Sequence, residues 1–167
     1  MFKLDTDAVA YVQKICDEIS QSQTKFTKFR LQMFFLLMAT LFFMSARITS
    51  VMLTKDHVPG QVAFAGVLAI IAGSFSCWKI TELEGIEKEF LQGNMVREDR
   101  FWSSRSVRIG TMILTPILVA DSIAAFPWVT AVLEAFALLF AIFWLYVTAC
   151  SPKLPLNHRF HEDSRIE

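Results

Sequence analysis

Three ionisable residues interrupt the long apolar stretches of this 167-residue chain: Arg47, Asp121 and Glu134. A lone charge deep in lipid costs at least about 2.5–3.5 kcal/mol, so such residues face protein or water and usually pair. With a helical rise of about 1.5 Å per residue, all three lie roughly 8–12 Å inside the same membrane boundary. We expect Arg47 to bridge to Asp121 or Glu134 in one charge layer, which leaves one carboxylate without a cationic partner.

Two interpretations of this charge layer stay open. In the first it is structural: Arg47 locks its helix to the last two spans, and the remaining carboxyl is protonated or reaches headgroup water. In the second, Asp121 and Glu134 line a path for protons or cations, and a kink at Pro116 gives that path a hinge.

Few residues of the chain could support catalysis, metal binding or redox chemistry. Cys16, Cys77 and Cys150 map to one side of the membrane, with no CxxC spacing, and are expected to be free structural thiols. His158 and His161 fall in the polar tail and no span contains a His, so neither a metal site nor axial haem ligation is expected. Because GxGxxG, P-loop and HExxH motifs are also lacking, we expect no enzyme, no cofactor and no metal.

Composition and spacing define the elements that hold these residues. The chain is 54% hydrophobic and 19% charged, more apolar than a soluble domain. Its zero net charge removes the electrostatic case for nucleic-acid binding. Stretches free of Asp, Glu, Lys and Arg, or nearly so, are long enough for four transmembrane helices. These spans are predicted at about 31–53, 61–80, 106–126 and 127–150.

The predicted fold is an all-α polytopic membrane protein with two helical hairpins. Residues 1–29 are read as a cytosolic amphipathic helix with Asp5 or Thr6 as its N-cap. Residues 30–150 form the four-helix transmembrane bundle, and 151–167 are a polar cytosolic tail. Pro127 suits a first helical turn, which puts the tip of the second hairpin at 126/127.

The connection 81–105 between the hairpins is also predicted to be largely helical. An apolar stripe at Ile80, Leu83, Ile86 and Phe90 indicates that the second span continues into the cytosol until Gly93-Asn94. This stripe and the stripe of the N-terminal helix are expected to pack together. Ser103 or Ser104 is the expected cap of the third span.

Basic residues orient the chain. Fourteen Lys and Arg lie in the N-terminal segment, the 79–108 connection and the tail, against Arg47 and Lys55 on the opposite side. The positive-inside rule then predicts that both termini lie in the cytoplasm. The expected location is the bacterial inner membrane. Aromatic interface anchors are expected near the inner boundary at Trp78, Trp102 and Trp144, and at the outer one at Trp128.

Small residues recur at Ala65, Ala69 and Gly73, a spacing that lets another helix backbone approach closely within one chain or between copies. The expected function is non-enzymatic, through helix packing, oligomerisation and partner binding in the lipid bilayer. A protein partner is expected at the cytosolic helices 5–29 and 80–92. The alternative is a proton- or cation-conducting pore, or a membrane-disrupting effector, that uses Asp121 and Glu134.

Overall fold

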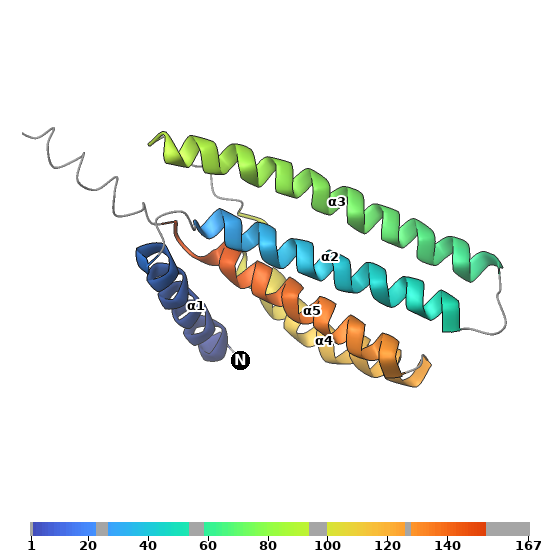
Figure 1. Ribbon diagram of the computed structural model, residues 1–167. Helices are drawn as coiled ribbons and strands as arrows, with labels where there is room; N and C mark the ends of the chain where they lie inside the picture. Colours follow the sequence, from blue (N-terminus) through green and yellow to red (C-terminus); the bar gives the residue numbers. More distant parts are fainter. Residues whose placement is uncertain (1, 23–26, 54–58, 94–99, 126–127, 153–167) are drawn as a thin grey trace, which may run out of the picture.

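The computed structural model describes residues 2–22, 27–53, 59–93, 100–125 and 128–152. In these segments the chain forms a bundle of helices (Figure 1). The five helices are α1 (Phe2–Ser22), α2 (Lys28–Leu53), α3 (Pro59–Leu91), α4 (Arg105–Ala125) and α5 (Trp128–Ala149). The second predicted span and its polar continuation are one helix, α3. The expected hairpin tip at 126/127 and the tail beyond residue 152 lie outside the described residues.

Three helices are long and apolar enough to cross a membrane: α2, the Ala63–Leu91 part of α3, and α5. These three apolar helices make the chain a helical bundle of the kind found in membrane proteins. Among the described residues, α4 does not meet the same criterion, so the fourth span stays a prediction.

Local signals explain where the helices begin and end. The Ser104 hydroxyl accepts a hydrogen bond from the Val107 backbone N–H, which confirms Ser104 as the cap of α4. Thr27 does the same for α2 through the Arg30 N–H. Gly93, with a φ of +80°, takes the left-handed conformation that follows a helix end. Because α1 already begins at Phe2, Asp5 lies in its first turn and the predicted cap at Asp5 or Thr6 is wrong.

An aromatic seam joins α2 and α5. The ring of Phe42 stacks on those of Phe136 and Phe140, with centroids 5.4 and 5.5 Å apart. About two turns towards the start of α2, Phe35 stacks on Phe143, with ring centroids 5.4 Å apart. Such offset pairs add to the burial of the rings themselves, so α2 and α5 form the most extensive helix pair of the bundle.

The other long helix, α3, runs along the far side of α2 (Figure 1). Near its middle the hydroxyls of Thr40 and Ser76 share a hydrogen bond of 2.5 Å. Further along, Leu83 and Phe90 of the predicted apolar stripe are buried against Phe29 of α2. The stripe of α3 therefore packs on the first turn of α2.

The first helix, α1, packs against α5 and α4. It lies on the opposite side of α2 and α5 from the end of α3 (Figure 1). The expected packing of α1 against residues 80–92 is therefore wrong. At one end of the bundle, α2 begins, α5 ends and α1 is attached. We call this end the α1 end.

Candidate functional site

Two of the three charged residues expected in the apolar part of the bundle form an ion pair. Arg47 of α2 contacts Glu134 of α5, with Nη2 and Oε1 2.5 Å apart. The Glu134 side chain is 11% exposed and that of Arg47 24%. The Arg47 guanidinium also lies over the Phe43 ring, 4.9 Å from its centroid. Its Nε is buried without a hydrogen-bond partner in the described part of the chain.

The remaining members of the predicted layer are less defined. Asp121 belongs to α4, but its side chain is outside those that the structure describes. Pro116 lies inside α4 and is exposed. The hydroxyls of Thr111 and Thr115 donate to the backbone carbonyls of Val107 and Thr111, as expected of such residues within an apolar helix.

A second charged cluster lies at the α1 end, and sequence reasoning missed it. Asp5 of α1 is 1% exposed. Its carboxylate accepts two hydrogen bonds of 3.0 Å from Arg108 of α4, one from Nε and one from Nη2. The Tyr146 hydroxyl of α5 donates a third bond, also of 3.0 Å. Arg105 lies 3.4 Å away at the exposed edge. We call these four residues the Asp5 clamp.

The clamp sets the charge state of its carboxylate. The hydrogen bonds from Arg108 lower the pKa of Asp5 below its ordinary value of 3.8, and this effect exceeds the opposing effect of burial. Asp5 is therefore ionised at neutral pH. Because its partners come from α4 and α5, one buried carboxylate ties three helices together.

Further contacts fasten the rest of α1. The side chain of Gln13 accepts a hydrogen bond from the Ser151 backbone N–H and donates one to the Ser151 carbonyl, at 2.8 and 3.3 Å. Cys16 and Cys150 are buried together beside Val147. A hydrogen bond between the two thiols lowers the pKa of Cys16. The third thiol, Cys77, is exposed on α3.

The outward face of α1 has no such partners within the described chain. Leu4 is 62% exposed, Tyr11 67% and Ile15 37%. Residues spaced by four and seven positions lie on one face of a helix, so these three side chains form a single row, which we call the outer row. The inner face of the same helix carries Asp5 and Cys16.

The small residues of α3 face its neighbour only in part. Ala65, Ala69 and Gly73 are all half-buried. A Cβ added to Gly73 would lie 3.9 Å from Sδ of Met44 in α2, whereas one added to Gly66 would meet nothing within 4 Å. The series of small residues thus comes close to α2 at Gly73 within one chain.

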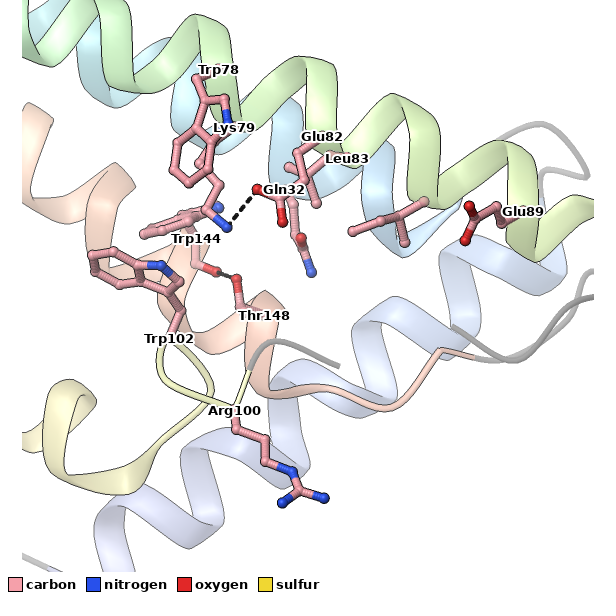
Figure 2. A pocket seen from close by; sticks show the side chains of 11 residues that line it. Gln32, Trp78, Lys79, Glu82, Leu83, Glu89, Arg100, Trp102, Trp144 and Thr148 are labelled. Carbon is pink, nitrogen blue, oxygen red and sulfur yellow. Dashed lines mark hydrogen bonds and ion pairs between the residues drawn. The ribbon is translucent and has the colours of Figure 1, made fainter. Parts of the chain in front are cut away.

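The tryptophans divide between the two ends of the bundle. Trp128 begins α5 and is largely exposed. Trp78 is also exposed, at the α1 end, while Trp102 is half-buried. Trp144 differs from the expected interface anchor because it is only 7% exposed. Its ring lies against that of Trp102, with centroids 5.2 Å apart (Figure 2).

The surface of the long helices is apolar where a soluble protein would be polar. Besides α1, each of α2, α3, α4 and α5 carries large exposed hydrophobic residues. They include Phe34, Leu37, Leu41 and Ile48 on α2, Phe64, Val67, Ile70 and Ile71 on α3, Ile113, Leu114 and Ile117 on α4, and Val132, Phe136, Leu139 and Phe143 on α5. Apolar surface of this extent is typical of a protein that contacts lipid.

Among the described residues, no group of three or more His, Cys, Asp and Glu could hold a metal ion. His158 and His161 lie outside the described residues. Comparison of the chain with models of known protein families, with curated proteins and with solved structures finds no match. The contacts above are therefore the basis for a functional interpretation.

Proposed function

We propose that the protein is a four-span protein of the bacterial inner membrane that acts without catalysis, by binding a protein partner or a second copy through α1. The outer row of α1 is the observation that carries this proposal. Its three exposed apolar side chains lie on a helix whose other face is fixed by the Asp5 clamp. A rigidly held helix with an unpaired apolar row is suited to helix-to-helix recognition.

The membrane placement draws on two further observations. Exposed Ile113, Leu114 and Ile117 support α4 as a fourth span beside α5. The arginines of the α1 end, among them Arg30, Arg105 and Arg108, support a cytoplasmic location of that end. In this orientation α1 lies next to the inner membrane surface, where a cytoplasmic or membrane partner can reach it.

The ion pair between Arg47 and Glu134 supports a structural role over conduction. A carboxylate held at 2.5 Å by a guanidinium of the same chain is not open to a transported cation. The pair also joins α2 to α5 on the seam where their phenylalanines stack. We therefore assign Arg47 and Glu134 to helix packing.

The experiment replaces the outer row and measures assembly. Leu4→Ser/Tyr11→Ser/Ile15→Ser is compared with Lys3→Ser/Asp7→Ser/Lys14→Ser, which changes three exposed polar positions of the same helix. We expect the outer-row variant alone to lose its oligomer or partner complex in detergent or nanodiscs, as measured by native mass spectrometry. Equal assembly of wild type and both variants would contradict the proposal.

Conduction is tested separately in proteoliposomes. The proposal predicts no proton or monovalent-cation flux above that of empty vesicles. It also predicts that Asp121→Asn/Glu134→Gln, although less stable because Arg47 loses its carboxylate partner, still assembles through α1. Flux that this double substitution abolishes would replace the proposal with a channel or transporter.

A further inference from the structure

A cavity of about 1000 Å³ lies at the α1 end of the bundle. The cavity is open on one side, and its lining residues come from α2, α3, α5 and the turn before α4 (Figure 2). The Asp5 clamp, Arg47 and Glu134 are not among its lining residues.

Aromatic rings line this space, and an unused hydrogen-bond donor is buried in its wall. Trp78, Trp102 and Trp144 all contribute to the wall. The indole N–H of Trp144 is buried and has no hydrogen-bond partner in the described part of the chain. A buried donor without an acceptor is costly, and an acceptor atom of a ligand in the cavity would remove that cost. The ammonium of Lys79 lies over the Trp78 ring, 5.1 Å from its centroid.

Charges of both signs line the cavity in equal number. Lys79 is 7% exposed, and its Nζ lies 2.9 Å from Oε2 of Glu82. Arg100 and Glu89 line the cavity as well, and both are exposed. A ligand with a single charge would be attracted by one half of this set and repelled by the other. A ligand with an anionic and a cationic group matches both halves.

The apolar surface of α3 leads directly to this cavity. Phe64, Ile71 and Trp78 are spaced by seven residues and are all exposed. Residues seven apart lie on one face of a helix, so the exposed apolar face of α3 ends at Trp78, on the cavity wall. Glu82 continues the same face one turn later. A molecule with long hydrocarbon chains could lie along Phe64 and Ile71 and place a polar head at Trp78 and Glu82.

We propose that this cavity binds the headgroup of a zwitterionic phospholipid that carries a phosphate and a primary ammonium group, as in phosphatidylethanolamine. The phosphate accepts hydrogen bonds from Lys79 and from the Trp144 indole N–H. The ammonium donates to Glu82 and lies against the aromatic wall, where a cation is attracted by the ring faces. A quaternary ammonium has no N–H to donate to the carboxylate, so phosphatidylcholine fits less well. The inference rests on the membrane placement proposed above and is independent of the partner of α1.

The test compares lipids that differ only in headgroup. Dioleoyl phosphatidylethanolamine, phosphatidylglycerol and phosphatidylcholine are titrated into delipidated full-length protein in detergent, and bound lipid is measured by native mass spectrometry. We expect phosphatidylethanolamine to bind about tenfold more tightly than the other two, as charge-assisted hydrogen bonds on both groups require. Lys79→Gln should remove this preference, while Lys88→Gln, at an exposed position on another face of α3, should keep it.

Trp144→Phe provides a second variant that removes the indole N–H and keeps a smaller aromatic ring at this position. We expect it to weaken phosphatidylethanolamine binding several-fold with an unchanged helical circular dichroism spectrum, so the proposal can still be judged if Lys79→Gln does not fold. Equal affinity for the three lipids, or a preference that survives both variants, would overturn the proposal. A preference for phosphatidylglycerol would overturn the zwitterionic assignment. Equally tight binding of water-soluble glycerophosphoethanolamine would overturn the lipid as the source of the headgroup. None of these results depends on whether α1 binds a partner.

Discussion

The Asp5 clamp predicts that one carboxylate controls the docking of α1. Replacing Asp5 by Ala removes the counter-ion of Arg108, a guanidinium that is itself only 7% exposed. It also removes the carboxylate acceptor of the Tyr146 hydroxyl, which is left with the Met112 thioether at 3.2 Å. Removing one partner of a buried ion pair costs about 3–5 kcal/mol. Arg108 keeps its hydrogen bond to the Ser103 carbonyl, so we take the lower end of that range, about 3 kcal/mol.

This cost falls on the attachment of α1 and leaves the α2–α5 seam unchanged. A change of about 3 kcal/mol shifts an equilibrium by about 100-fold, so the undocked population of α1 should rise by about that factor. Hydrogen–deuterium exchange in nanodiscs measures it directly: amides of α1 should exchange about 100-fold faster, with α2 and α5 protected as in the wild type. Asp5→Asn, which retains a carbonyl acceptor but no charge, should give a smaller acceleration.

Asp7→Ala is the matched control, because Asp7 lies on the same helix and is exposed. It should leave the exchange of α1 unchanged. Wild-type protection of α1 in Asp5→Ala, with the rest of the bundle folded, would refute the assignment of α1 docking to the clamp. Equal acceleration in Asp7→Ala would show that helix charge in general, and not the buried cluster, controls docking.

Three further predictions follow from the same contacts. Arg47→Leu should lower the free energy of unfolding by about 3 kcal/mol, because it leaves Glu134 buried without its cation. In thermal denaturation, Arg47→Leu/Glu134→Leu should recover most of that loss. Equal stability of Arg47→Leu and the wild type would show that the pair contributes nothing. Because the folded-state pKa of Asp5 is lowered, its contribution to docking is present above pH 3.8 and is lost as the pH falls through the lower folded value. The protection of the α1 amides relative to their intrinsic exchange at each pH should therefore be constant from pH 7 to 5 and fall only in stronger acid. A loss of protection between pH 7 and 5 would contradict this assignment. Gly73→Leu should lower the melting temperature, because the added side chain meets Met44 at the α2–α3 contact. Gly66→Leu, on open surface, should not lower it. Equal melting temperatures of the two variants would show that α2 and α3 do not come closest at Gly73.

The sequence predicts the helices well because the signals that define them are local. Apolar runs, a capping Ser104 and Gly93 beyond the end of α3 each act within a few residues. The contacts that attach α1 to the rest of the chain are not local, because Asp5 and Arg108 are separated by 103 positions. A sequence signal did exist, since Asp5 interrupts a face that otherwise carries Val12 and Cys16. A carboxylate in line with apolar residues is an indication of a buried ionic partner.

Two other differences have physical reasons. The stripe of residues 80–92 indicates only that an apolar face must be covered, and it fits the first turn of α2 as well as it fits α1. Glu87 helps to decide between them, because it accepts hydrogen bonds from Thr27 at 2.6 Å and from Arg30 at 2.9 Å. Trp144 was expected at the membrane interface from its amphipathic ring, but the neighbouring Trp102 covers it.

The most direct test of the central claim is site-specific photo-crosslinking in intact membranes. A photoreactive phenylalanine derivative replaces Tyr11 of the outer row or, as the control, Ala10, which is also exposed but lies on another side of α1. We predict one discrete protein adduct from position 11, either a dimer of this chain or a complex with one partner, and none from position 10. Adducts only to lipid at position 11, or identical adducts from both positions, would contradict the claim that α1 is the recognition element.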